Sequence, residues 1–190
     1  MSGPPPAEDP LAPVPDDETE EDVGDPGDPG DERGIETARF RQVLGHFATG
    51  VTVVTTVDEG EPAGLSVNSF TSVSLEPPLV AFCVASVSRT WPRIRAMGSF
   101  CVNVLGEDQE DLSRAFARRS TDKFRGVGWR PAESGAPILA GVLAWLDCSV
   151  EAEHGAGDHV IVVGRVRDMG VAHEGSPLVF YRGGYGRFQP

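Results

Sequence analysis

The chain has few cysteines and no long apolar run. Cys83, Cys101 and Cys148 are its only cysteines among 190 residues. They lie far apart in apolar stretches and form no Cys-x-x-Cys pair, so we expect buried free thiols in a reducing compartment. No apolar run approaches the roughly 18 residues of a membrane span, and no signal-peptide pattern opens the chain. We therefore expect a cytoplasmic protein.

Several motifs of nucleotide-binding and hydrolytic enzymes are also missing. The sequence contains no GxxxxGK[ST] loop, no GxGxxG between a strand and a helix, and no GxSxG. It also lacks HExxH and paired cysteines, which makes a zinc enzyme unexpected, and we predict no metal site. A nucleotide cofactor would therefore have to bind without a Rossmann fold.

Acidic charge is concentrated at one end of the chain. Residues 1–34 hold 12 Asp and Glu against one Arg, together with eight of the 16 prolines. This composition predicts a disordered tail, serving either as a solubilising extension or as a docking segment. Residues 35–190 carry a net charge of only −2 and should form one domain. The lack of excess basic charge argues against nucleic acid as a partner.

Residue patterns in the domain predict many strands and few helices. Apolar spacing indicates helices at 36–48, 90–97 and 107–119, whereas residues 126–137 should form a loop. Residues 73–75 and 79–85 should form one longer β region, interrupted at Pro77-Pro78. Further runs rich in β-branched residues predict strands at 51–56, 63–70, 100–105, 143–153, 159–166 and 178–181. Hairpin-length connections favour a mainly β fold, an antiparallel barrel with peripheral helices.

Ser88-Arg89-Thr90 comes directly before a predicted helix. Thr90 is a favourable N-cap residue, and Pro92 is tolerated in the first helical turn. Free backbone N–H groups and the guanidinium of Arg89 could together bind an anion such as phosphate. The alternative is a capped helix with a solvated arginine.

Short polar side chains cluster in the preceding strand region. In a strand, Asn68 and Ser72 share one face, whereas Ser69 and Thr71 share the other. They could hydrogen-bond the edge of a heteroaromatic ring, or they could belong to an exposed polar edge strand. His159 enters an apolar strand after Gly157-Asp158 and could donate to an anion or a carboxamide, although a structural role is the alternative.

In order along the chain, these motifs resemble the flavin reductase-like family with an FMN-binding split barrel. This family includes the reductase components of two-component flavin monooxygenases. The similarity runs from about Phe40 to Tyr185 and rests on residues 49–56, 68–70, 74–79, 88–91, 100–105, 122–124, 157–159 and 180–183. Each motif alone is weakly specific, but together they cover nearly the whole predicted domain.

The resemblance implies a homodimeric split barrel that binds FMN or FAD noncovalently. The residues implied at the isoalloxazine ring and the ribityl chain are Pro62, Ala63, Gly64, Leu65, Ser66, Asn68, Ser69, Cys83, Val84 and Ala85. Those implied at the phosphate are Ser88, Arg89 and Thr90, with a further flavin contact from Ala115 and Phe116. The nicotinamide side would consist of His159, Phe180, Tyr181, Arg182 and Gly183.

By this resemblance, the activity is hydride transfer from NADH or NADPH to flavin, with His159 and Arg182 positioning the nicotinamide. The reduced flavin would then serve a partner monooxygenase. Three alternatives remain open: an enzyme that keeps its flavin and reduces another substrate, a non-catalytic flavin carrier or sensor, and a barrel that only dimerises. A pure carrier would not need the pair of His159 and Arg182 on the nicotinamide side.

Overall fold

The structure is a computed structural model that describes residues 34–120 and 122–188. The tail predicted for residues 1–34 lies outside this range except for Gly34. The features described below belong to the compact unit Glu36–Pro190.

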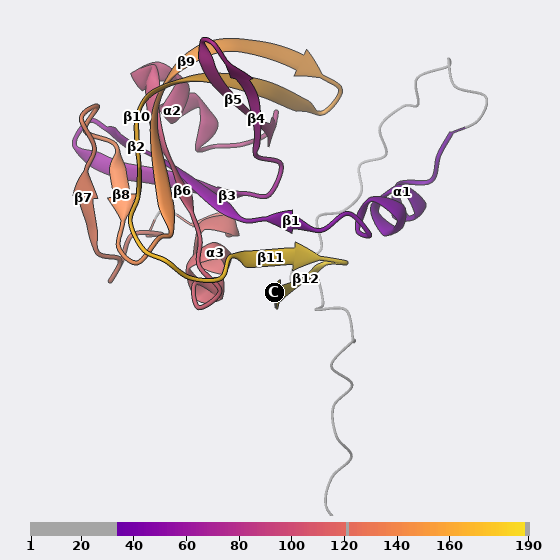
Figure 1. Cartoon of the computed structure of the whole chain (residues 1–190). Coiled ribbons are helices and arrows are strands. Elements are labelled where there is room, and N and C mark those ends of the chain that lie inside the picture. The colour runs from indigo at the N-terminus through magenta and orange to yellow at the C-terminus, as the bar shows by residue number, and fades with distance from the viewer. Residues whose placement is uncertain (1–33, 121, 189–190) are drawn as a thin grey trace, which may run out of the picture. The chain divides into compact units, whose positions relative to one another are not determined.

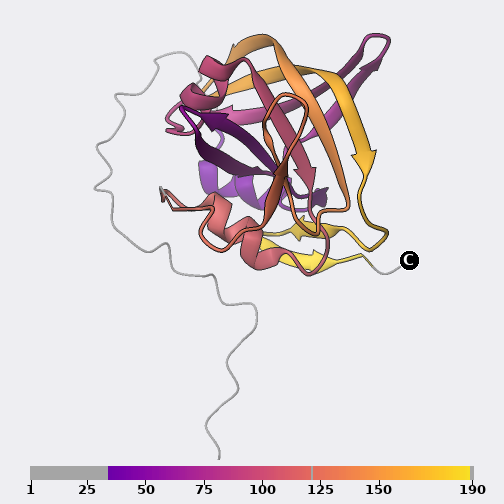
Figure 2. The same cartoon turned by 90° about the vertical axis from the view of Figure 1, so that its left-hand side faces the viewer.

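A seven-stranded antiparallel sheet forms the centre of the fold, and the predicted mainly β class is confirmed (Figure 1). Figures 1 and 2 show its strands twisting and curving around a common core. The long hairpin of β9 and β10 lies in the middle of the strand order, whereas β3 and β4 form the two ends. In spatial order the strands are β3 (Glu61–Val67), β2 (Thr52–Asp58), β6 (Ser99–Val104), β9 (Ala144–Ala156), β10 (His159–Val171), β5 (Pro78–Ala85) and β4 (Thr71–Leu75).

Strands β4 and β5 form a hairpin rather than the one longer β region expected from the sequence. The chain reverses at residues 76–77, and the two strands then pair antiparallel. The pairing shifts register between Ser72 and Ser74, which marks an irregularity of the bulge type. The two prolines therefore mark a reversal of direction.

Two smaller sheets complete the β structure. One consists of β1 (Thr49–Gly50), β11 (Leu178–Tyr181) and β12 (Gly184–Arg187), and the other of β7 (Trp129–Pro131) and β8 (Pro137–Leu139). The expectation of a plain loop at 126–137 is wrong, because β7 and β8 pair there. Strands of three residues containing proline are too short to show an alternating pattern. Strand β12 was missed because it has only four residues, two of them glycine.

Among the residues that the structure describes, three short helices flank the strands: α1 (Thr37–Leu44), α2 (Trp91–Met97) and α3 (Glu110–Ala117). Helix α2 packs against β2, and α3 packs against β3. Helix α1 buries none of its residues, so its predicted apolar face is exposed to solvent in the single chain. No helix in the described part of the chain is both long enough and apolar enough to cross a membrane.

The core consists of two apolar clusters. One is centred on Phe82 and Phe100, whose rings meet edge to face with centroids 5.5 Å apart. The other packs Phe116 and Leu139 beneath α3. Strand β6 contributes to both, with Phe100 and Val102 in the first cluster and Cys101 in the second, because successive residues of a strand point to opposite faces. They fix the strands and the helix that carry the candidate site.

Candidate functional site

A cavity of about 390 Å³ opens between β3, β5, the start of α2 and the segment after α3. It brings together three segments that are distant in sequence: 62–65, 83–85 and 88–90. The predicted flavin residues that line it are Pro62, Ala63, Gly64, Leu65, Cys83, Val84, Ala85, Ser88, Arg89, Thr90 and Phe116. This is the first cavity.

Basic side chains dominate the charge of the first cavity. Five of its lining residues are basic, and none is acidic: Arg89, Arg93, Arg118, Arg119 and Lys123. A concave site lined by charge of one sign concentrates ligands of the opposite sign. The cavity is therefore suited to an anionic ligand with an apolar portion, because its other walls consist of small and aromatic side chains.

Gly64 lies in the wall of the first cavity, directly against a buried aromatic ring. A Cβ at this position would lie 2.7 Å from Cε1 of Phe116 and 3.0 Å from the carbonyl oxygen of Val54. The Phe116 ring is fully buried and meets Phe124 edge to face at 4.9 Å. A side chain at position 64 would therefore force the Phe116 ring or the β2 backbone to shift, which favours glycine here.

Lys123 ties two sides of the same wall together. Its Nζ donates to the carbonyl oxygen of Gly64 at 3.2 Å and to that of Phe116 at 3.0 Å. Burial lowers the pKa of Lys123 from its ordinary value. The ammonium group thus joins β3 to the end of α3 beside the cavity.

The expected capping role of Thr90 is wrong. Thr90 has helical backbone angles, and its side chain makes no capping hydrogen bond. Instead, Oγ of Ser88 accepts a hydrogen bond from the backbone N–H of Trp91 at 3.2 Å. Helix α2 is also only seven residues long.

A second cavity of about 690 Å³ lies beside α1 and the β11–β12 turn. It collects five of the predicted site residues: Asn68, Ser69, Phe180, Arg182 and Gly183. The backbone N–H of Cys83 donates to Oγ of Ser69 at 2.8 Å, and that hydroxyl lies 3.2 Å from the carbonyl oxygen of Cys83. Since Cys83 lines the first cavity, this contact joins the walls of the two cavities.

The β11–β12 turn gives Arg182 a defined place in the second cavity. Arg182 and Gly183 both have positive φ angles, of 51° and 81°, as in a two-residue hairpin turn of type I′. The backbone N–H of Arg182 donates to the carbonyl oxygen of Gly45 at 2.9 Å. This bond connects the turn to the end of α1.

His159 lies outside the lining of both cavities, but next to the first one. It is the first residue of β10 and pairs with Ala85, which lines the first cavity. Its Nδ1 lies 2.7 Å from Oδ1 of Asp158, and this hydrogen bond holds the pKa of Asp158 below its ordinary value. An ionised Asp158 can only accept this hydrogen bond, so Nδ1 of His159 carries the proton.

Three other predicted residues lie outside both cavities: Ser66, Ala115 and Tyr181. The hydroxyl of Ser66 meets that of Ser113 at 3.0 Å, and Ser113 meets the Tyr185 hydroxyl at 2.9 Å. Ser66 therefore links β3, α3 and β12. Tyr181 meets the ring of His46 edge to face at 6.1 Å.

Sequence reasoning missed eight residues that line the first cavity. They are Val87, Arg93, Ala117, Arg118, Arg119, Ser120, Lys123 and Phe124. The run of basic residues at 118–119, followed by Lys123 after a polar helix, was the available signal. Residues 122–124 contributed to the family resemblance, but none of these residues was assigned to the site, because no pattern along the chain places this segment opposite residues 62–65.

The mainly antiparallel fold and a cavity whose charged lining residues are all basic suit a protein that binds an anionic ligand without a Rossmann fold. The family model described as "Flavin reductase like domain" matches residues 44–189. The chain belongs to this family and is a flavin reductase, which confirms the family and the enzyme class predicted from its sequence.

Known proteins that are similar to this chain over most of its length support this assignment. The chain is 49% identical over 156 residues to "Flavin-dependent monooxygenase, reductase subunit HsaB" of Rhodococcus jostii, covering 82% of this chain and 80% of that protein. Nitrilotriacetate monooxygenase component B from Mycobacterium thermoresistibile has a similar structure, with a TM-score of 0.79 and 48% identity over 80% of this chain and 87% of that one.

A third relative was solved with nucleotide fragments. It is the Streptomyces globisporus NADH:FAD oxidoreductase SgcE6 in complex with NAD and FAD fragments. Its TM-score is 0.76 and its identity 43%, over 80% of this chain and 93% of that one.

Proposed function

We propose that this flavin reductase transfers a hydride from NADH or NADPH to FMN or FAD and supplies the reduced flavin to a partner monooxygenase. The observation that carries the proposal is the first cavity, where segments 62–65, 83–85 and 88–90 meet. All charged residues that line this cavity are basic. The names of the Rhodococcus and Streptomyces relatives support the same chemistry.

The residues of the first cavity fit a flavin. Gly64 leaves the wall flat where a Cβ would collide with Phe116. The small side chains of residues 83–85 on β5 leave space for a ring on that side of the cavity. Arg89, with the hydroxyls of Ser88 and Thr90, would bind the phosphate, because a guanidinium donates in a fork that matches phosphate oxygens. The apolar wall would then hold the ring, and the polar end the phosphate.

When bound, the flavin ring supplies the acceptor of the hydride. The chain's own contribution is alignment, because hydride transfer requires the reacting atoms about 3–3.5 Å apart. Arg182, fixed by the β11–β12 turn, would position the nicotinamide from the side of the second cavity. His159, oriented by Asp158, would do so from beside the first cavity. Backbone N–H groups around Ser66 to Ser69 would stabilise the negative charge that develops on the reduced ring.

The central sheet would form a split barrel, and two copies of the chain would form a dimer. Exposed apolar side chains support the dimer. Phe40, Val43 and Leu44 lie on α1, and Phe47, which follows it, is 74% exposed. Apolar surface of this kind, beside a cavity, is typical of an interface. Phe40, Leu44 and Phe47 also line the second cavity, so the partner copy would lie close to the nicotinamide side.

Two further features of this proposal concern the setting of the enzyme. The protein would act in the cytoplasm, where NADH or NADPH and a partner monooxygenase are available. Flavin would exchange rather than remain permanently bound, since it must carry electrons to that partner.

The test is NADH oxidation by the purified full-length chain, followed by the near-ultraviolet absorbance of NADH. Separate assays contain FMN, FAD or riboflavin, and a control assay contains no flavin. A parallel series uses NADPH in place of NADH. The proposal predicts oxidation that requires added flavin and saturates with it. Protein that binds flavin but oxidises neither donor would instead be a flavin carrier.

A further inference from the structure

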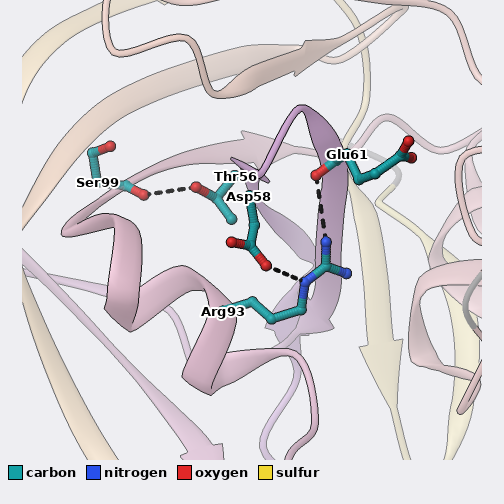
Figure 3. A network of polar contacts seen from close by, with 5 residues as sticks. All are labelled: Thr56, Asp58, Glu61, Arg93 and Ser99. Carbon is teal, nitrogen blue, oxygen red and sulfur yellow. Dashed lines mark hydrogen bonds and ion pairs between the residues drawn. The ribbon is translucent and has the colours of Figure 1, made fainter.

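Arg93 reaches from α2 across to the β2–β3 hairpin (Figure 3). Its Nε donates to Oδ2 of Asp58 at 2.7 Å, and its Nη2 lies 3.5 Å from the carbonyl oxygen of Glu61. Asp58 ends β2 and Glu61 begins β3. The guanidinium is therefore held by a carboxylate at Nε, and its Nη2 lies near a backbone carbonyl.

The same side chain lines the first cavity, together with Ser88, Arg89 and Thr90. A guanidinium carries five N–H donors in a fixed plane. The contacts with Asp58 and Glu61 occupy the N–H of Nε and one of the two N–H groups of Nη2. The described residues provide no further hydrogen-bond partner for this guanidinium. Three donors thus remain available on a group whose position is already fixed.

We propose that Arg93, aimed by Asp58, is a second phosphate-contacting arginine of the flavin site and makes it select phosphorylated flavins over riboflavin. This inference rests on the proposed placement of flavin in the first cavity. Asp58 is the positioning residue, since it bonds to Arg93 and does not itself line the cavity. The ligand chemistry is a phosphate ester, found as a monoester in FMN and within the pyrophosphate of FAD.

The energetics favour a role in alignment over one in stability. The side chains of Arg93 and Asp58 are 39% and 24% exposed, and ion pairs with such access to water stabilise a fold little. The pair does restrict the rotamers of Arg93, so less entropy is lost when the guanidinium meets a ligand. Arg89, by contrast, lies in an exposed position before α2.

Helix α2 supplies a matched control. Arg95 makes an ion pair with Glu153 at 3.1 Å, also between α2 and a strand, but it does not line the first cavity. Arg95→Gln removes the same charge from the same helix as Arg93→Gln. A difference between these variants therefore reports contact with the ligand rather than the general field of the helix.

The experiment measures the dissociation constants of FMN, FAD and riboflavin by flavin fluorescence, without nicotinamide, for the full-length wild type and each variant. Arg93→Gln should raise the FMN constant about tenfold and leave riboflavin within about twofold. Asp58→Ala should raise the FMN constant less. The double variant Asp58→Ala with Arg93→Gln should match Arg93→Gln alone, because both act through one group.

Arg95→Gln should bind all three flavins like the wild type. The FAD series shows whether the pyrophosphate is recognised through Arg93 in the same way. An unchanged FMN-to-riboflavin preference in Arg93→Gln, or an equal loss in Arg95→Gln, would overturn the inference. A wild type that binds none of the flavins would instead contradict the proposed function, so the two failures are distinguishable.

Discussion

At the scale of single residues, close contacts decide what the first cavity can hold. Gly64, Phe116 and Lys123 form one connected wall, in which the glycine lets the buried ring approach β3 and the lysine ties both backbones together. None of these three residues needs to react with anything. Their contribution is the shape of the surface on which an aromatic ligand would lie.

Gly64→Ala tests that wall. The added methyl group would lie 2.7 Å from the Phe116 ring, which Phe124 holds in place. We expect the FMN dissociation constant to rise at least tenfold and the protein to lose about 1–3 kcal/mol of stability, as overpacked positions do. Fluorescence titration and urea unfolding measure the two effects. Gly50→Ala, which places a Cβ with no neighbour within 4 Å, is the control and should change neither.

His159 provides a second prediction at this scale. It pairs with Ala85 at the edge of the first cavity and is oriented by Asp158. His159→Ala should therefore raise the KM for NADH by about tenfold and the KM for flavin by less than twofold. His173→Ala removes an exposed histidine from a loop and should change neither value. Equal increases in both KM values for His159→Ala would contradict the nicotinamide role.

At the scale of the elements, the central β9–β10 hairpin holds the sheet in register. Strand β10 pairs with β5, which carries the cavity residues 83–85, and with β9 on its other side. The pairing with β9 shifts register between Val163 and Gly164. At this point β10 passes close to the Phe100 ring, so packing favours glycine at position 164.

Gly164→Ala tests the element. A Cβ there would lie 2.5 Å from Cζ of Phe100, a fully buried ring that also packs against Phe82. We expect a loss of about 1–3 kcal/mol in the free energy of unfolding, measured with urea. Gly155 lies in the same hairpin, and a Cβ there would have no neighbour within 4 Å. The Gly155→Ala variant should therefore have the same free energy of unfolding as the wild type.

The elements also show how far sequence reasoning extends. The longer strands were predicted, because their β-branched runs match a buried sheet. The β7–β8 pair and β12 were not, since strands of three or four residues with glycine or proline carry no periodic signal. The segments 62–65, 83–85 and 88–90 were assigned to one site by family resemblance. Arg93 and Lys123 were missed because their roles depend on contacts with residues 35 and 59 positions away.

At the scale of the whole molecule, a single chain exposes apolar side chains to water, which is unfavourable. The α1 face is the clearest case, since α1 buries none of its residues and its apolar side chains border the second cavity. A second copy of the chain would cover this face and would complete the surroundings of Arg182. The assembly and the nicotinamide side would then depend on the same residues.

Phe47→Ser tests this dependence. If α1 forms the dimer interface, the change should shift the protein toward monomer and raise the KM for NADH. Light scattering after size-exclusion chromatography measures the mass across protein concentrations. Val171→Ser removes a side chain that is 81% exposed at the end of β10 and serves as the control. A dimer of unchanged stability in Phe47→Ser would show that the interface lies elsewhere.

The central claim is that flavin occupies the first cavity, and the three cysteines allow a direct test. Cys83 is partly exposed and lines that cavity, whereas Cys101 and Cys148 are buried. Burial raises the pKa of both buried thiols, that of Cys148 to about 12, so neither should react in the folded protein.

The measurement is the alkylation rate of each cysteine in the full-length protein, followed by mass spectrometry with increasing FMN. Our account predicts that Cys83 reacts alone, and that FMN slows this reaction in proportion to the fraction of protein bound. An unchanged rate at Cys83 under saturating FMN would contradict it, and would place the flavin outside the cavity formed by 62–65, 83–85 and 88–90.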